Sequence, residues 1–147
     1  MKKLICSIIA VISFQFNVTS QELSPYIKVG ESTETMQQVS ENVIAALKDN
    51  SFTILGFYNP ARKSSLKVIA FTNSSLKNTV IKVTDRGALA ATMKVGLVQK
   101  NGKITISYTN PDYILRAYLR DNYNSYRSTF EKFSSDVKLA LSSIGNN

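Results

Sequence analysis

The most informative absence in this 147-residue sequence is histidine, of which there is none. Histidine is the commonest general base in enzymes and the commonest protein ligand of transition metals. Any catalysis would therefore have to use serine with lysine, carboxylates, tyrosine or arginine. We predict no catalytic residues, no metal site and no bound cofactor.

Cysteine is almost as scarce, since the sequence has only one, Cys6. It lies in an apolar run from Leu4 to Phe16. Lys2 and Lys3 precede this run, and a polar stretch follows it. A positive start, a short apolar run and a small residue before a polar stretch are typical of a secretory signal peptide. The alternatives are an uncleaved anchor or a buried strand, although the run is short for a membrane span of about 20 residues.

Val18 and Ser20 suit the positions before a cleavage site, which we place after Ser20. We expect residues 1–20 to be removed and residues 21–147 to form one periplasmic or secreted domain. That domain has no cysteine, so disulfides, a thiol nucleophile and thiolate metal ligands are excluded. No later segment is apolar enough to span a bilayer.

The sequence is basic, and loss of Lys2 and Lys3 lowers its net charge from +8 to +6. A basic surface favours acidic partners such as anionic lipid headgroups or acidic glycans. Nucleic acid is the least expected partner outside the cytoplasm. The alternative is that the charge only keeps the domain soluble.

The first half of the domain predicts strand, helix, strand, strand. Alternation at Tyr26–Val29 indicates a strand that ends at Gly30, and apolar spacings from Met36 to Leu47 indicate an amphipathic helix. Ser32 or Thr33 would cap this helix, with Glu34 in its first turn. Strands are expected at 52–58 and 66–72, and residues 74–84 fit either helix or strand.

The second half predicts a hairpin and a long helix. Residues 90–100 and 103–109 flank Asn101-Gly102, the strongest short-range hairpin signal. Asn110 and Pro111 then open a helix within about 111–144, which at about 32 residues and about 1.5 Å per residue is roughly 48 Å long. Such a helix must overhang the sheet, kink near 122–125 or cover a partner. The order predicts an α+β fold, β-α-β4-α, with an antiparallel sheet whose helices pack on one face.

This order and three stretches of sequence resemble the DUF302 family over about residues 26–111. The stretches are 67–73, 88–95 and 101–107, the last leading into Asn110-Pro111. The resemblance implies the TT1751-like fold, of TATA-binding-protein-like architecture, and no particular activity. The family typically has Cys-Asn-Pro-like and Leu-Pro-Cys-like stretches, where this chain has Thr72-Asn73-Ser74 and Ala91-Thr92. These departures argue against a thiol-based role.

Two patterns could carry catalysis. A Ser-x-x-Lys spacing can mark a serine nucleophile with a lysine base. It recurs without companion motifs, which favours coincidence, at Ser64/Lys67, Ser74/Lys77 and Ser135/Lys138. The pair Asp85-Arg86 fits a solvated turn better than a site.

The richest candidate cluster lies in the last predicted helix. Arg116, Arg120 and Arg127 would share one helical face, with Tyr123 beside them. Arginine and tyrosine together can bind anions through hydrogen bonds and stacking, so we take these four residues as candidate anion or ligand contacts. The alternative is that the tyrosines of this helix, Tyr123 among them, pack on the sheet while the arginine side chains extend into water.

The leading functional hypothesis is an exported, non-enzymatic domain that binds an apolar or anionic small molecule or lipid. Helices on one face of a single sheet leave a concave groove or a bare sheet face where such a molecule could bind. A second hypothesis is a structural module in which the sheet face or the long helix forms a homodimer. A third is an enzyme of unrecognised type, against which the lack of histidine, and of cysteine after residue 20, weighs.

Overall fold

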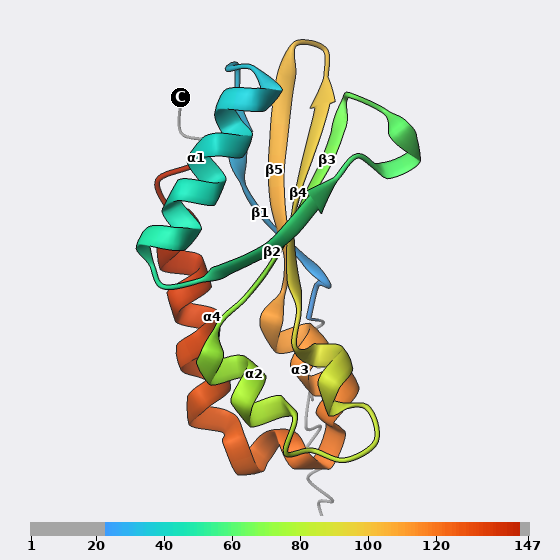
Figure 1. The fold of residues 1–147 in the computed structure, drawn as a ribbon, viewed down its shortest axis with the longest axis vertical. Helices are drawn as coiled ribbons and strands as arrows, with labels where there is room; N and C mark the ends of the chain where they lie inside the picture. The colour runs from blue at the N-terminus through green and yellow to red at the C-terminus, as the bar shows by residue number, and fades with distance from the viewer. Residues whose placement is uncertain (1–22, 145–147) are drawn as a thin grey trace, which may run out of the picture.

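The computed structural model describes residues 23–144, so the predicted signal peptide lies outside the described part of the chain. Within it, five antiparallel strands form one sheet in the order β1-β5-β4-β3-β2 (Figure 1). Their bounds are β1 (Tyr26–Ser32), β2 (Thr53–Tyr58), β3 (Leu66–Thr72), β4 (Met93–Lys100) and β5 (Lys103–Thr109). The edge strands are β1 and β2, and β4 lies at the centre.

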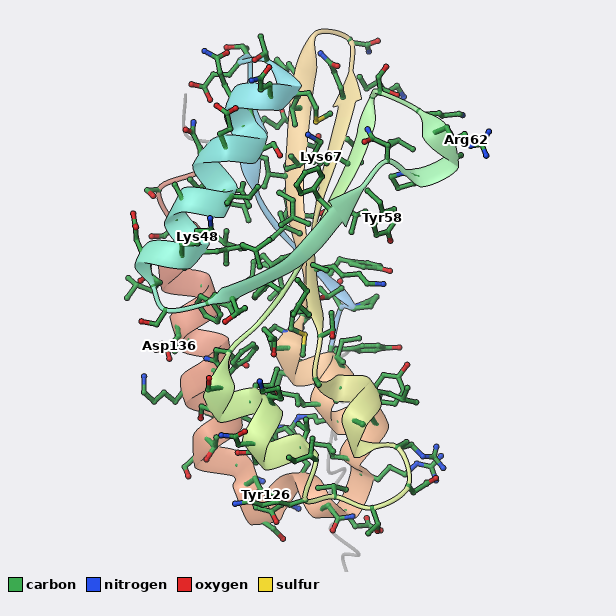
Figure 2. All side chains as sticks on the ribbon, in the orientation of Figure 1. Lys48, Tyr58, Arg62, Lys67, Tyr126 and Asp136 are labelled. Atoms are coloured by element: carbon green, nitrogen blue, oxygen red, sulfur yellow. The ribbon has the colours of Figure 1, made fainter. Side chains whose placement is uncertain are left out.

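The two long helices, α1 (Met36–Asp49) and α4 (Arg127–Leu141), lie side by side on one face of the sheet (Figure 1). The shorter α2 (Ser74–Val80) and α3 (Pro111–Leu119) lie beyond one end of the strands. Lys48 of α1 and Asp136 of α4 are on one side of the sheet, and Tyr58 of β2 is on the other (Figure 2). The predicted α+β class and antiparallel sheet are confirmed.

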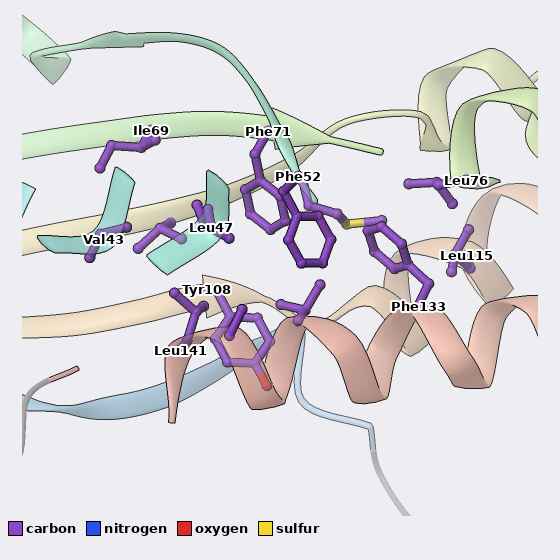
Figure 3. Packing of buried hydrophobic residues seen from close by; sticks show 14 of the residues in the cluster. Val43, Leu47, Phe52, Ile69, Phe71, Leu76, Tyr108, Leu115, Phe133 and Leu141 are labelled. Carbon is purple, nitrogen blue, oxygen red and sulfur yellow. The ribbon is translucent and has the colours of Figure 1, made fainter. Parts of the chain in front are cut away.

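The core lies between the sheet and the two long helices (Figure 3). Alternate strand residues such as Ile69 and Phe71 point into it and are fully buried. Phe52 packs edge to face on Phe71 and Phe133, with ring centroids 5.4 and 5.7 Å apart. Such pairs add about 0.5–1.5 kcal/mol beyond area burial, so they tie the entry to β2 both to the central sheet and to α4.

The β4–β5 hairpin forms where the sequence predicts it. Asn101 and Gly102 both have positive φ, 52° and 74°, which the tight turn requires and which these residue types tolerate. Lys100 and Lys103 pair directly across it. The turn therefore fixes the register of the two central strands.

The predicted start of α1 is wrong by two to three residues. β1 continues through a bulge at Lys28/Gly30 as far as Ser32, which is buried and pairs with Ile104. The helix cap is Thr35, whose side chain accepts from the Gln38 amide at 3.2 Å while the Gln38 side chain accepts from the Thr35 amide at 3.2 Å. Because Ser32 is held in the sheet, the chain turns into the helix only after Glu34.

The undecided segment 74–84 begins as a helix. The Asn73 side chain accepts from the Leu76 amide at 2.8 Å, and Leu76 and Val80 are buried. The following short 3-10 segment, η2 (Gly87–Ala90), takes the residues before β4. The strand therefore starts at Met93 and not at Ala90.

The predicted helix 111–144 is not continuous, and the kink expected near 122–125 as one of three outcomes is a full break. α3 ends at Leu119, a 3-10 segment η3 (Arg120–Tyr126) turns the chain, and α4 runs back beside α1 (Figure 1). Arg120 has φ 49° and ψ −120°, which no α-helix accommodates. The predicted apolar stripe is nevertheless buried on both sides of the break, as at Leu115 and Phe130. Among residues 23–144, no helix has both the length and the apolar character of a membrane span.

Candidate functional site

The sheet face opposite α1 and α4 is open, and its centre is lined by small side chains. In the register, Gly96 of β4 lies between Val68 of β3 and Ser107 of β5. One step along the same face, Lys94 pairs with Ala70. Because Gly96, Ala70 and Ser107 have small side chains or none, the surface of this face is lowest at the central strand.

Larger apolar side chains surround this floor. Tyr26 and Tyr58 stand on the two opposite edge strands, which are about 19 Å apart at about 4.8 Å per strand. Leu89 of η2 with Ile114 and Tyr118 of α3 close one end. Leu89 is 66% and Tyr26 is 63% exposed, so the walls present apolar surface to water.

We call the resulting depression the sheet hollow, and its volume is about 610 Å³. Ligand pockets commonly measure about 300–1,000 Å³ and combine apolar walls with a few polar groups. The sheet hollow matches that description. Its lining residues are Tyr26, Tyr58, Val68, Leu89, Thr92, Lys94, Gly96, Ser107, Tyr108, Thr109, Ile114 and Tyr118.

Lys94 is the one charged residue in this lining. Within residues 23–144 it makes no ion pair, whereas Lys28 on the same face binds Glu31 at 2.7 Å. The hydroxyls of Thr92 and Ser107 make no hydrogen bond within the described chain, while that of Thr109 accepts from the Lys94 amide at 3.0 Å. Besides the tyrosine hydroxyls of its lining, the sheet hollow thus offers one ammonium and the two aliphatic hydroxyls of Thr92 and Ser107 to a ligand.

The predicted arginine and tyrosine cluster is only partly assembled. Arg116 Nε lies 3.2 Å from Asp112 Oδ2, and its guanidinium carbon is 4.1 Å from the centre of the Tyr123 ring. The Tyr123 hydroxyl donates to the other oxygen of Asp112. Burial above all, and then Asp112, raises the pKa of Tyr123 to about 12. These three residues join the start of α3 to η3.

The prediction that Arg116, Arg120 and Arg127 share one helical face is wrong, because the helix breaks at Arg120. Arg127 donates to Asn124 Oδ1 at 2.7 Å, and the described structure gives the Arg120 side chain no hydrogen bond or ion pair. Arg116 also lies on the side of α3 away from Ile114 and Tyr118, since it is about 200° round the helix from Ile114. Their role as anion contacts stays a prediction.

The candidate catalytic pairs stand apart from the sheet hollow. Lys67 lies over the Phe57 ring at 5.4 Å, and Asp85 binds its neighbour Arg86 at 2.9 Å in an exposed turn. In none of the three Ser-x-x-Lys pairs does the serine hydrogen-bond to its lysine within the described chain. Residues 23–144 also hold no group of three or more acidic, histidine or cysteine side chains placed to bind a metal.

The open sheet face fits the groove or bare face expected from the sequence, but none of the residues that line the sheet hollow was predicted, although one of them signalled it. An isolated glycine inside a strand often marks a place where a ligand or another backbone comes close. Gly96 is such a residue, in the run that predicts β4. The tyrosines and α3 residues that complete the walls come together only through the fold.

Comparison with known proteins agrees with the fold. A family model described as "Domain of unknown function DUF302" matches residues 29–140, so the likeness extends past Pro111 through most of α4. The chain is also similar to the crystal structure of an uncharacterized conserved protein DUF302 from Bacillus stearothermophilus. The identity is 14% and the TM-score 0.67, and the match covers 81% of this chain and 97% of that one. Comparison with curated proteins gives no match.

Proposed function

This chain belongs to the DUF302 family, and we propose that it binds a small, largely apolar molecule in the sheet hollow rather than catalysing a reaction. The volume, the apolar walls and the few polar groups at the floor support this proposal. The sequence has no histidine, and its one cysteine, Cys6, lies in the predicted signal peptide. Both points weigh in the same direction.

Gly96 is the observation that carries the proposal. A Cβ at this position would meet only Ser107, its Oγ at 3.7 Å and its carbonyl oxygen at 4.0 Å, which are ordinary contacts. Its φ is not among the positive values that favour glycine. Glycine inside a strand costs roughly 0.5–1 kcal/mol relative to alanine. Neither packing nor backbone conformation demands this glycine, and what it does provide is depth at the centre of the floor.

The test uses N-phenyl-1-naphthylamine, a neutral aromatic probe whose fluorescence rises in apolar surroundings. We expect saturable binding to residues 21–147 and at least tenfold weaker binding to the Gly96→Leu variant, because leucine fills the floor. Unfolding in urea should show that this variant is at least as stable as the wild type.

The matched control is Thr105→Leu, which places the same side chain on the open face but outside the lining of the sheet hollow. Its probe affinity should stay within twofold of wild type. Equal affinity of Gly96→Leu and wild type, or no saturable binding at all, would refute the proposal.

We also propose that the domain acts outside the cytoplasm. The charged start, the apolar run and the small residue Ser20 support export. N-terminal sequencing of protein recovered from the periplasm or medium should give Gln21 as the first residue. Retention in the cytoplasm with Met1 in place would contradict export and leave the binding proposal standing.

A further inference from the structure

We propose that the ligand carries one negative charge, which Lys94 binds at the floor of the sheet hollow. This inference rests on the proposed binding function and adds the chemical class of the ligand. The class is an amphipathic monoanion, meaning a flat or chain-like apolar body with a single carboxylate or sulfonate.

The first argument is the way charges are distributed over the open face. Glu31 lies at one edge of it and binds two lysines, Lys28 at 2.7 Å and Lys103 at 3.7 Å. The lining of the sheet hollow contains no acidic residue. Lys94 therefore supplies positive charge to the hollow that no carboxylate of the lining neutralises.

The second argument is the position of Lys94 in the sheet. It lies on the central strand, beside Ala70 and two residues from Gly96 on the same face. The Thr109 hydroxyl accepts from its backbone amide at 3.0 Å, which fixes the main chain there. Within residues 23–144 the ammonium itself has no hydrogen bond or ion pair. The side chain therefore rises from the floor, within reach of a ligand that fills the sheet hollow.

The third argument is the set of donors beside it. A carboxylate or sulfonate has several acceptor sites, and charge-assisted hydrogen bonds satisfy them best. The hydroxyls of Ser107 and Thr92 line the same hollow and have no partner within the described chain. One ammonium with two hydroxyls matches one anionic group, whereas a polyphosphate would need several cations.

The surroundings strengthen the attraction. Coulomb energy rises as the local dielectric falls, and side chains such as Tyr26, Leu89 and Tyr118 reduce the water around the bound anion. The same walls provide the apolar contact for the body of the ligand. Charge and apolar surface thus select together for an amphipathic anion.

The test compares two probes with the same aromatic skeleton. N-phenyl-1-naphthylamine is neutral, and 8-anilinonaphthalene-1-sulfonate adds one sulfonate. We expect the wild type to bind the sulfonate about tenfold more tightly, with an affinity that falls as salt screens the charge. Lys94→Met should remove this preference while its affinity for the neutral probe stays within twofold.

Two controls accompany this test. Lys48→Met removes an exposed lysine on α1, on the other side of the sheet, and should leave both affinities unchanged. Lys94→Arg keeps the charge and should keep the preference for the sulfonate.

The two proposals fail differently. If both probes bind the wild type equally and Lys94→Met changes neither, the anion inference is overturned while binding in the sheet hollow stands. If Gly96→Leu leaves both affinities unchanged, the probes bind elsewhere and both proposals fall.

Discussion

Gly87 and Gly96 show how differently one residue type is used in this chain. A Cβ on the buried Gly87 would lie 2.2 Å from the Val80 carbonyl oxygen and 2.9 Å from Val83 Cβ. Gly87 therefore permits the close packing of η2 on the end of α2. A Cβ on Gly96 would meet ordinary contacts only.

The same substitution should have opposite effects at these two positions. Gly87→Ala is expected to lower the free energy of unfolding by about 1–3 kcal/mol, because backbone must move to relieve the overlap. Gly96→Ala is expected to leave it unchanged or raise it by about 0.5–1 kcal/mol. Urea unfolding of both variants measures this, and a stable Gly87→Ala variant would show that the contact with Val80 relaxes freely.

The hydroxyl of Tyr123 should make stability depend on high pH. The pKa of this buried phenol is raised from 10.0 to about 12, so folding favours its protonated form. The resulting stabilisation is complete below pH 10 and is lost as the pH rises from 10 toward 12. Tyr123→Phe removes the donor to Asp112, which should cost about 1–2 kcal/mol at neutral pH.

The measurement is urea unfolding at pH 8 and at pH 11. The wild type should lose more stability between these values than Tyr123→Phe does. Tyr113→Phe, at an exposed tyrosine of α3, is the control and should follow the wild type. Parallel losses in the wild type and Tyr123→Phe would show that Tyr123 does not carry the dependence.

At the scale of elements, the break between α3 and α4 rests on one strained residue. Arg120 has φ 49° and ψ −120°, a conformation that glycine adopts readily and that strains other residues by about 1–3 kcal/mol. Arg120→Gly should therefore raise the free energy of unfolding by about 1 kcal/mol, after allowing for the greater freedom of glycine in the unfolded chain.

Arg120→Ala separates strain from the loss of the arginine side chain. Alanine keeps a Cβ, so this variant should gain nothing. Urea unfolding of the two variants makes the comparison. Lower stability of Arg120→Gly than of Arg120→Ala would mean that the backbone there is not strained.

Periodicity predicts the elements of this fold but not how they end. The strands alternate and the apolar stripe from Leu115 to Leu141 is buried as expected, because both patterns record which side faces the core. The length of the helix predicts a kink near 122–125 as one outcome, but neither glycine nor proline marks Arg120, where the break begins. The break follows from the gain when α4 turns back to cover the sheet, which is a tertiary effect.

The caps show the same limit on a smaller scale. The sequence predicts Ser32 or Thr33 as the cap of α1. Pairing of Ser32 with Ile104, which lies 72 positions away, keeps the chain in β1 as far as Ser32, and the cap is Thr35. A distant strand therefore decides where the helix begins.

For the whole molecule, the candidate site is a property of the assembled sheet. Its walls come from β1, β2, η2 and α3, which are far apart in the sequence. Residues on an open face are not constrained by packing, so their pattern carries little signal beyond Gly96. The arginines attracted attention in the sequence because they fit a continuous helix, and the break removes that arrangement.

The open face raises the question of whether a second copy covers it, and we expect that none does. A symmetric dimer whose two-fold axis passes through the centre of this face would bring the central strands together and place Lys94 near Lys94 of the second copy. Such like charges oppose association. The edge strands β1 and β2 each carry a bulge, which discourages pairing at the edges.

Residues 21–147 should therefore sediment as a monomer at micromolar concentration and at moderate salt. Lys94→Met, which removes the repulsion, should associate more readily than Lys48→Met. A wild-type dimer that Gly96→Leu dissociates would instead assign the sheet hollow to a second copy of the chain, and would replace ligand binding with self-association as its function.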